Sequence, residues 1–160
     1  MTTTTSCKER LEFFLKGANV PFEEHKHPIA YTAQAVAEAE HVSGKNVAKV
    51  VIGIVGDVPE MFVLPAAYRL DLQKAARAVA ADEVRLAHEA EFEALFPDSE
   101  VGAMPPFGEL YGIRTYLDES LAEAEYIIFQ AGTHDEAMKM KGQDYLRVVR
   151  PTVVDIAFRG

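Results

Sequence analysis

Hydrophobic residues recur at helical spacing in several segments of this chain. Leu11, Phe14 and Leu15 follow Ser6, whose side chain can form a capping box with Glu9, and this predicts a helix over Cys7–Lys16. Polar caps and chain breakers bound further helical segments at Thr32–Glu40, Asp71–Ala80, His88–Leu95, Glu119–Ala124 and Gln143–Val148. Each predicted helix is short, which is typical of helices at the periphery of a sheet.

Runs rich in β-branched residues separate these helices. The strongest strand signal is Lys49–Val55 followed by Glu60–Leu64, joined by Gly56-Asp57-Val58-Pro59, which predicts an antiparallel hairpin with Val50 to Ile52 buried on both faces. Shorter extended segments are predicted at Val20–His25, Arg114–Leu117, Tyr126–Phe129 and Thr152–Phe158. The irregular order favours an α+β fold: a single compact domain over residues 1–160, with a mixed, mostly antiparallel sheet or partial barrel and peripheral helices.

The composition fits a globular chain with a substantial core. Its 160 residues are 49% hydrophobic and 26% charged, and 25 acidic against 16 basic residues give a formal net charge of −9. This charge disfavours a general nucleic-acid binder. It is unevenly spread, because residues 82–136 hold 14 acidic and two basic residues, whereas residues 138–160 hold five basic and two acidic ones.

The single cysteine and the apolar runs bear on location. Cys7, expected near a frayed N-terminus, cannot alone form an internal disulfide or a thiolate metal cluster, which suits a reducing compartment. No leader pattern is visible, and the longest apolar run, Val50–Val55, is far shorter than the roughly 20 residues of a membrane span. A cytoplasmic protein without a membrane partner is therefore expected.

The histidines near the N-terminus allow two interpretations. Common hydrolase, phosphate-loop and zincin motifs are absent from the sequence. His25 and His27 alternate on an extended segment, and His41 could complete a three-imidazole zinc site, which would make the protein a small metallohydrolase. The alternative is that His25 pairs with neighbouring carboxylates and His27 only precedes a proline turn.

The segment Gly102-Ala-Met-Pro-Pro-Phe-Gly108 combines stiffness with backbone access. Its two prolines fix φ and supply no N–H, while Gly102 lets the backbone approach a ligand and present its own N–H to a carbonyl. Such a loop can clamp a carbonyl or an oxyanion. The structural alternative is a rigid connector that buries Met104 and Phe107 in the core.

Two further residues stand out by position. Lys49 begins the most apolar strand, where its ammonium must reach solvent, pair with a carboxylate, or face a cleft and bind a phosphate or polarised carbonyl. His134 lies in Gly132-Thr133-His134, just after the strand at Tyr126–Phe129, where an imidazole can position or activate water. The structural alternatives are a lysine that extends to solvent and a histidine bonded to backbone.

The order of these features along the chain is similar to that of a known family. The features are His27-Pro28 with Tyr31-Thr32, Ala48-Lys49-Val50, Arg69-Leu70-Asp71, Gly102 to Gly108, Leu117-Asp118 and Gly132-Thr133-His134. Together they resemble the YbaK/EbsC family, relatives of the prolyl-tRNA synthetase editing domain, from about Leu11 to Phe158.

The resemblance implies an aminoacyl-tRNA deacylase that acts in trans on the ester between a wrong amino acid and the terminal adenosine of tRNA. It implies that Lys49 contacts the 3′-terminal nucleotide, that the backbone of Gly102–Pro106 holds the aminoacyl group, and that His134 and Asp118 are functional. It implies no metal or other cofactor, because the family uses the adenosine 2′-hydroxyl to position or activate water. The missing nucleophile motif fits, since an activated ester needs only a positioned water and a carbonyl clamp.

By analogy with the family, amino-acid choice is expected in a pocket formed by Tyr31, Thr32, Ile52, Met104, Pro105, Pro106, Phe107 and Gly132. A small pocket separates small side chains poorly, because one methylene is worth about 1–3 kcal/mol. Alanine, serine, threonine and cysteine esters are therefore all expected substrates.

The expected partner is the acceptor end of a mischarged tRNA, delivered by a synthetase or an elongation factor, with no DNA partner. Because acidic residues dominate, phosphate contacts are expected only near Lys49 and in the basic C-terminal stretch, with a shallow salt dependence. A non-catalytic module of the same fold that binds an aminoacyl or nucleotide ligand is the alternative function class.

Overall fold

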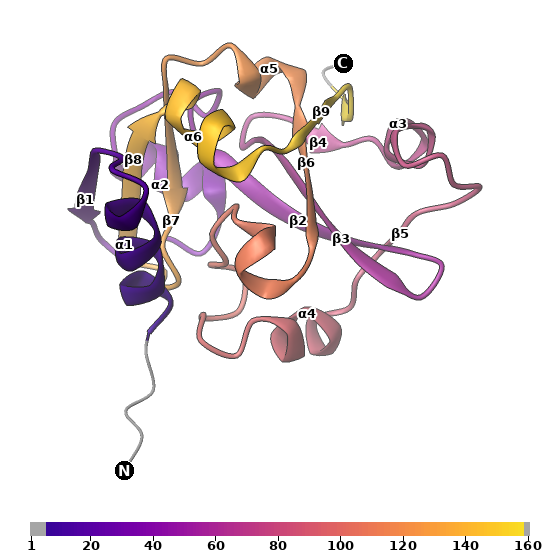
Figure 1. The fold of residues 1–160 in the computed structure, drawn as a ribbon, viewed down its shortest axis with the longest axis horizontal. Coiled ribbons are helices and arrows are strands. Elements are labelled where there is room, and N and C mark those ends of the chain that lie inside the picture. The colour runs from indigo at the N-terminus through magenta and orange to yellow at the C-terminus, as the bar shows by residue number, and fades with distance from the viewer. Residues whose placement is uncertain (1–5, 159–160) are drawn as a thin grey trace.

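A computed structural model describes residues 6–158, in which helices surround three hydrogen-bonded sheets (Figure 1). The helices are α1 (Cys7–Gly17), α2 (Ala33–Ala39), α3 (Leu72–Ala78), α4 (Glu89–Leu95), the short 3₁₀ helix η1 (Gly108–Tyr111), α5 (Glu119–Ala122) and α6 (Gly142–Val149). The strands are β1 (Phe22–Lys26), β2 (Ala48–Val55), β3 (Val58–Pro65), β4 (Arg69–Leu70), β5 (Arg85–Leu86), β6 (Arg114–Asp118), β7 (Tyr126–Gln130), β8 (Glu136–Lys141), β9 (Thr152–Val154) and β10 (Ala157–Phe158).

Polar side chains start the helices where the sequence predicts. The Glu9 N–H donates to Ser6 Oγ at 3.1 Å and the Glu9 carboxylate accepts the Ser6 N–H, which completes the capping box of α1. Thr32 caps α2 and Asp71 caps α3 through their side-chain oxygens. These caps satisfy N–H groups that have no partner within the helix. The predicted starts of the three helices are therefore confirmed, although α3 ends before Ala80.

The five-stranded sheet, in the order β5-β2-β3-β6-β9, is built around the β2–β3 hairpin. Val58 and Pro59 already pair with β2, so the turn consists only of Gly56 and Asp57 and is shorter than predicted. Gly56 has a φ of 63°, which a two-residue hairpin turn requires. Strand β6 pairs in parallel with both β3 and β9, so this sheet is mixed.

The three-stranded sheet, in the order β1-β8-β7, is antiparallel and contains a strand that the sequence does not predict. Strand β8 consists of Glu, Ala, Met and Lys, which favour helix over strand. It is extended because β1 and β7 pair with its two edges. The predicted strand at Thr152–Phe158 is likewise divided, since β9 joins the large sheet and β10 pairs with β4.

An isolated parallel bridge between Val47 and Ile128 joins the two larger sheets. The described strands do not close into a barrel and form three sheets rather than one. The prediction of an α+β fold with a mixed, mostly antiparallel sheet is confirmed.

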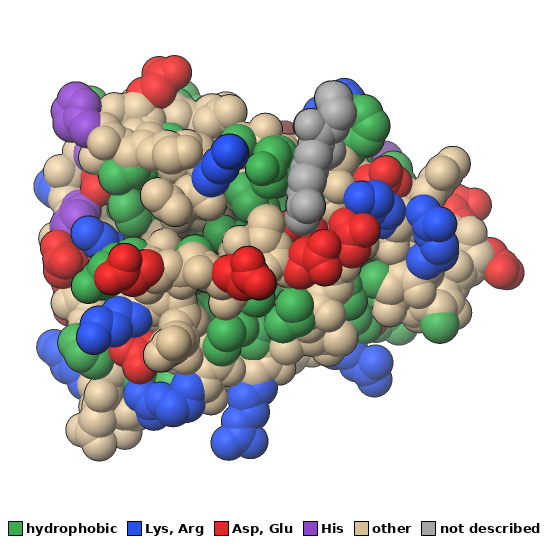
Figure 2. All heavy atoms as spheres, turned by 90° about the horizontal axis from the view of Figure 1, so that it is seen from above, with side chains coloured by type: hydrophobic (Ala, Val, Ile, Leu, Met, Phe, Trp, Pro, Cys, Tyr) green, Lys and Arg blue, Asp and Glu red, His purple; other side chains and the backbone are tan. Residues whose placement is uncertain are grey.

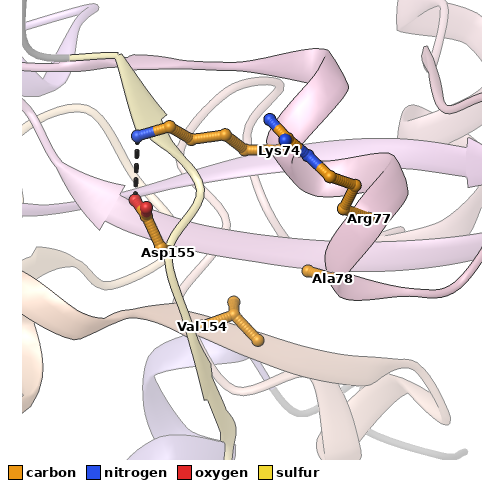
Figure 3. A pocket seen from close by; sticks show the side chains of 5 residues that line it. All are labelled: Lys74, Arg77, Ala78, Val154 and Asp155. Carbon is orange, nitrogen blue, oxygen red and sulfur yellow. Dashed lines mark hydrogen bonds and ion pairs between the residues drawn. The ribbon is translucent and has the colours of Figure 1, made fainter.

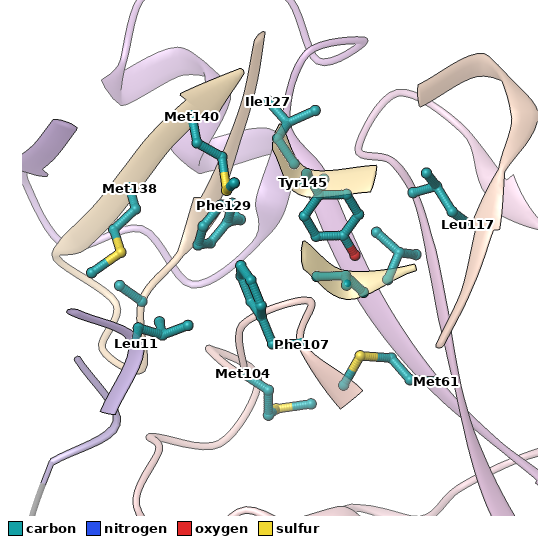
Figure 4. Close-up of a cluster of buried hydrophobic side chains, with 14 of the residues drawn as sticks. Leu11, Met61, Met104, Phe107, Leu117, Ile127, Phe129, Met138, Met140 and Tyr145 are labelled. Carbon is teal, nitrogen blue, oxygen red and sulfur yellow. The ribbon is translucent and has the colours of Figure 1, made fainter. Parts of the chain in front are cut away.

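The main core lies between the two larger sheets and is covered by α1 and α6 (Figure 4). It contains Leu11 of α1, and the ring of Phe107 packs edge-on against those of Tyr145 in α6 and Phe129 in β7. A second cluster packs α2 against the other face of β7, and a third packs α3 against the large sheet. The helices thus cover the faces of the sheets, as the sequence predicts.

The pleat of β2 separates its residues between these clusters. Ala48, Val50 and Ile52 pack in the main core, whereas Val51 packs in the cluster under α3. Val50 and Val51 are only half-buried, so the prediction that Val50 to Ile52 is buried on both faces is wrong for these two residues. Lys49 alternates with Val50 and therefore faces away from the main core.

The surface carries both signs of charge on one face. In the view of Figure 2, carboxylate side chains form a row across the face, with Lys and Arg side chains on either side. The uneven spread of charge along the sequence therefore does not give this face a single sign. Over residues 6–158, no helix combines the length and apolar character that crossing a membrane requires.

Candidate active site

Two loops that are distant in sequence are joined by four hydrogen bonds. The Glu100 N–H donates to the Gly132 carbonyl at 2.7 Å, and the Gly132 N–H donates to the Ala103 carbonyl at 2.9 Å. The His134 N–H donates to Glu100 Oε1 at 2.7 Å, and His134 Nε2 lies 2.8 Å from the Val101 carbonyl oxygen. The Gly-x-x-x-Pro and Gly-Thr-His motifs are thus held together as one rigid unit.

Gly102 lies at the centre of this unit in a conformation that favours glycine. Its φ is 86°, a region that L side chains rarely adopt. A Cβ at this position would come no closer than 3.7 Å to His134, so backbone conformation rather than lack of space requires glycine. No acceptor among the described residues takes the Gly102 N–H. This N–H is available to an incoming oxygen atom.

His134 is held on both sides of its ring. In addition to Val101, its Nδ1 lies 3.4 Å from Nε2 of Gln130, and its ring contacts that of Tyr31 with centroids 5.0 Å apart. The predicted alternative of a loop histidine bonded to backbone is therefore confirmed, without excluding a role in the site. Sequence reasoning missed Gln130, although a polar residue that ends an apolar strand is a signal that could have found it.

The position of Lys49 follows from the bridge between the sheets. Val47 and Ile128 pair in parallel, and residues two positions further on lie on the same face as the bridged pair. Lys49 and Gln130 therefore lie on the same face of the joined sheets. Because Gln130 contacts His134, Lys49 faces the side of the molecule that carries the two-loop unit.

Lys49 has an unfavourable electrostatic environment. It is half-buried, and no carboxylate among the described residues lies within ion-pair distance of it. Burial, and secondarily the positive charge of Arg69, lower the pKa of its ammonium group. A lysine in this environment has unused capacity to bind an anion.

Several residues predicted to line the amino-acid pocket belong to the core. Ile52 is 4% exposed and Phe107 is 1% exposed, and both belong to the main cluster with Met104. Figure 4 shows Met104 and Phe107 in this cluster. Pro105 and Pro106 are buried. These side chains are closely packed in the core, as the connector alternative describes for Met104 and Phe107. Their role in an amino-acid pocket stays a prediction.

The Tyr145 hydroxyl, which donates to the Pro106 carbonyl at 2.6 Å, fixes the proline end of the loop. Of the other predicted pocket residues, Tyr31 and Thr32 are exposed, and Gly132 has a φ of 99°. Thr32 also caps α2. Gly132 is buried, and its N–H and carbonyl are bonded to Ala103 and Glu100. The accessible part of the predicted pocket therefore consists of Tyr31, Thr32 and the backbone of Gly102.

Asp118 has a structural role in the fold, and its predicted functional role stays a prediction. Its side chain is fully buried, and Oδ1 accepts the N–H groups of Ile156 and Ala157 at 3.0 and 3.1 Å. Its Oδ2 accepts the Ser120 N–H at 3.2 Å and the Ser120 hydroxyl. The carboxylate therefore starts α5 and holds the segment between β9 and β10.

The N-terminal histidines do not form the alternative zinc site. Nδ1 of His25 lies 2.5 Å from Glu40 and Nε2 lies 3.0 Å from Glu23, as the carboxylate interpretation predicts. Nδ1 of His27 bonds the Pro28 carbonyl at 2.7 Å. Among residues 6–158, no three His, Cys, Asp or Glu side chains are grouped so as to hold a metal ion.

The prediction that Cys7 lies near a frayed N-terminus is wrong, because α1 packs on the core and buries it. The thiol is 2% exposed, and burial raises its pKa. A Cβ at Gly132 would lie 2.7 Å from Cys7 Cβ, which shows how closely α1 approaches the loop that carries His134. Helix α1 therefore supports the two-loop unit from behind.

An open cavity of about 490 Å³ lies elsewhere, between α3 and the chain around β9 (Figure 3). Lys74 and Arg77 line one side and Asp155 the other. Lys74 Nζ donates to Asp155 and to the Ala157 carbonyl, each at 3.0 Å. Because this ammonium is already used to hold the C-terminal segment, we assign no catalytic role to the cavity.

Known proteins of similar sequence and structure point to one family. The sequence matches the model of the aminoacyl-tRNA editing domain over residues 27–148. A solved structure described as a candidate trans-editing enzyme for prolyl-tRNA synthetase superimposes with a TM-score of 0.82 at 22% identity, covering 98% of this chain and 100% of that chain. No curated protein matches the sequence.

Two other solved structures share the fold. A hypothetical protein superimposes with a TM-score of 0.85 at 19% identity, covering 94% of this chain and all of that chain. A scaffold protein from a computational epitope-grafting design gives a TM-score of 0.83 at 22% identity, covering 98% and 100% of the two chains. The family match spans well over half of the chain and includes Lys49, Gly102 and His134, so this chain belongs to the aminoacyl-tRNA editing domain family.

Proposed function

We propose that the protein is an aminoacyl-tRNA deacylase that hydrolyses, in trans, the ester of a mischarged small amino acid on tRNA. The observation that carries this proposal is the Gly102 N–H, which has no acceptor among the described residues and lies in a loop fixed by four hydrogen bonds. A preorganised N–H donor stabilises negative charge on the oxygen of an ester carbonyl as water adds to it. Membership of the editing-domain family supplies the substrate class.

The proposed reaction needs no protein nucleophile. The oxygen of a water molecule bonds to the ester carbonyl carbon, and the carbonyl oxygen accepts a hydrogen bond from the Gly102 N–H. The bond between this carbon and the adenosine 3′-oxygen then breaks, and the 3′-oxygen takes a proton. The products are the free amino acid and deacylated tRNA. Family resemblance assigns the adenosine 2′-hydroxyl to position the water.

Lys49 is proposed to bind the terminal nucleotide. Its half-buried ammonium has no carboxylate partner in the described part of the chain, and a phosphate would supply the missing negative charge. Binding of the nucleotide there would place the ester against the two-loop unit, because Lys49 and Gln130 lie on the same face of the sheets. Positioning of this kind accounts for a large share of catalysis when the bond is already activated.

Small amino acids are the proposed substrates by analogy with the family that the sequence resembles. Met104 and Phe107 pack in the core, which leaves exposed Tyr31, Thr32 and Gly102 to contact the side chain. Contacts of this kind exclude bulky residues by steric clash. Delivery of the tRNA by a synthetase or an elongation factor, and action in the cytoplasm, belong to the same proposal.

The proposal is tested with tRNAs that carry alanyl, seryl, threonyl or cysteinyl esters. Release of amino acid by wild-type protein in the absence of added metal is expected, together with its loss in Lys49→Ala. The exposed Lys16 of α1 provides the control, since Lys16→Ala removes the same charge from a distant surface. Binding of the tRNA without release of amino acid would instead identify a non-catalytic module of the same fold.

The salt dependence of the same reaction tests how the tRNA is bound. Because the net charge is −9, we propose that phosphate contacts are confined to the acceptor end. A shallow decrease of kcat/KM with salt is expected. A steep decrease, as for a protein that contacts many phosphates, would contradict this mode of binding.

A further inference from the structure

We propose that Gln130 is a positioning residue: its side-chain amide fixes the tautomer of His134, so that His134 holds the Val101 carbonyl and thereby aims the Gly102 N–H. The catalytic consequence rests on the proposed deacylase function, whereas the tautomer itself can be tested without it. The inference starts from the atoms that surround the two side chains.

The Ala30 carbonyl determines how the Gln130 amide is oriented. Gln130 is buried, and its Nε2 lies 3.3 Å from the Ala30 oxygen. A carbonyl oxygen can only accept hydrogen bonds, so the group that faces it must be the NH₂ end of the amide. The same NH₂ group lies 3.4 Å from Nδ1 of His134. It has two hydrogens and can donate one to each acceptor.

The two neighbours of the imidazole then select one tautomer. Because the Gln130 NH₂ donates towards Nδ1, this nitrogen must offer a lone pair. Nε2 lies 2.8 Å from the Val101 carbonyl oxygen, which only accepts, so Nε2 must carry the proton. Both contacts are satisfied by the neutral ring protonated at Nε2. A second proton at Nδ1 would face the NH₂ group of Gln130.

The hydrogen bond from His134 Nε2 to the Val101 carbonyl sets the direction of the Gly102 N–H. The described chain contains no cis peptide bonds, and in a trans peptide the carbonyl and the following N–H point in opposite directions. Because the Val101 carbonyl points at His134, the Gly102 N–H points away from that ring. No acceptor in the described chain competes for this N–H. Gln130 therefore controls, through His134 and Val101, the direction of the donor that would meet the substrate.

Other groups around the ring are consistent with a neutral imidazole. The Tyr31 ring packs against it, and the Glu100 carboxylate accepts the backbone N–H of His134 at 2.7 Å rather than bonding the ring. Asp135, the adjacent carboxylate, accepts the Thr133 hydroxyl at 2.9 Å. Lys49 lies on the same face as Gln130 and is the charged group that faces this side from β2. With both nitrogens engaged, His134 has no free lone pair with which to remove a proton from water.

Substitutions that change only the hydrogen-bonding capacity of Gln130 test the inference by activity. Gln130→Glu replaces the NH₂ with an acceptor, which favours a proton on Nδ1 and repels the Ala30 carbonyl. We expect kcat/KM to fall at least about tenfold, because a small misplacement of a catalytic donor is costly. Gln130→Met, which removes the donor without adding charge, is expected to lose less. The control is Gln143→Glu, the same change at an exposed position of α6.

Substitutions of His134 distinguish two roles for its ring. One is to donate a hydrogen bond to the Val101 carbonyl, and the other is to remove a proton from water. The side-chain nitrogen of glutamine reaches the position of Nε2 and can donate to the Val101 carbonyl, but it cannot act as a base. His134→Gln is therefore expected to retain more activity than His134→Ala by about tenfold, with a pH profile like that of wild type. Equal loss of activity in both variants, with the acidic limb of the profile removed as for loss of a general base, would overturn the inference.

The ¹⁵N NMR spectrum of the His134 ring tests the tautomer in the free protein. At alkaline pH, the wild type is expected to carry one ring proton, on Nε2, and this proton should exchange slowly with water. Gln130→Glu is expected to move the proton to Nδ1 or to add a second proton. An unchanged ring spectrum in folded Gln130→Glu would overturn the inference. If the wild type shows the expected tautomer but releases no amino acid, the proposed function fails while the hydrogen-bonding role of Gln130 stands.

Discussion

Lys49 and Asp118 are charged residues on the same five-stranded sheet, and their surroundings are opposite. The Asp118 carboxylate accepts four hydrogen bonds from Ser120, Ile156 and Ala157. The Lys49 ammonium has no carboxylate partner in the described chain, and burial together with Arg69 lowers its pKa. A charge whose bonding capacity is filled by backbone stabilises the fold. A half-buried charge without a partner destabilises it and points to a ligand.

Substitution of Lys49 should give the largest effect, and it should separate activity from stability. We expect Lys49→Met to reduce kcat/KM for deacylation by about 10²–10³-fold, the range seen when one preorganised electrostatic contact is removed. The measurement is amino-acid release from mischarged tRNA at limiting substrate. Lys16→Met provides the control.

The stability of Lys49→Met tests whether the Lys49 ammonium destabilises the folded protein. Because the pKa of Lys49 is lowered on folding, the unfolded chain binds its proton more tightly, and the folded state is destabilised at neutral pH. This penalty is relieved only as the pH rises through the lowered pKa. Lys49→Met removes it, so Tm at neutral pH should equal or exceed that of wild type. A large decrease in Tm would contradict the comparison.

Asp118 should show the reverse pattern. Asp118→Asn replaces one acceptor oxygen with a donor that faces backbone or hydroxyl donors, and we expect a loss of about 3 kcal/mol in the free energy of unfolding. Urea denaturation measures this loss, and exposed Asp82→Asn is the matched control. Activity per folded molecule should be nearly unchanged. Loss of activity without loss of stability would support the functional role predicted from the sequence.

Gly102 should show a moderate effect on both quantities. Because its φ is 86°, Gly102→Ala forces a strained backbone, with an expected cost of about 1–2 kcal/mol in stability. Relaxation of this strain would turn the 102 N–H, so kcat/KM should fall about tenfold. The control is Gly17→Ala at the end of α1, where a Cβ meets no atom within 4 Å. Equal effects of the two substitutions would argue against a special conformation at Gly102.

His25 should show the smallest effect. Its hydrogen bonds to Glu40 and Glu23 raise its pKa on folding. Stability from this group is therefore fully present below the unfolded value of about 6.5 and is lost as the pH rises through the raised pKa. Thermal denaturation should show a small decrease in Tm over that range, and His25→Asn should abolish this decrease. An identical pH dependence in the variant would assign the change to other groups.

The parts of the fold that the sequence predicts are those fixed by local chemistry. The capping box at Ser6, the cap at Thr32 and the β2–β3 hairpin depend on residues that are close in sequence, and all are confirmed. Strand β8 was missed because its extended form depends on pairing with β1, more than 100 residues earlier. Its own residues favour helix, and tertiary contacts override that preference.

The sequence located the motifs of the candidate site but not the directions of their side chains. The sequence motifs identified Gly102 and His134 as candidate site residues, and the structure joins the two loops that carry them. Family resemblance placed Asp118 and Phe107 along the chain but could not give the direction of their side chains, which are buried away from solvent. Gln130 was missed because its importance depends on contacts with Ala30 and His134 that only the folded chain creates.

The close packing of Cys7 on Gly132 provides the protein with an intrinsic reporter. The thiol is buried and its pKa is raised, so it reacts with a thiol reagent only when the packing around it opens, which includes its contacts with Gly132 and Tyr111. Its labelling rate therefore measures how often this side of the site opens. Because Cys7 is the single cysteine of the chain, the native protein yields this rate without any engineered label. Comparing the rate with and without a bound acceptor end would show how strongly substrate closes the loop.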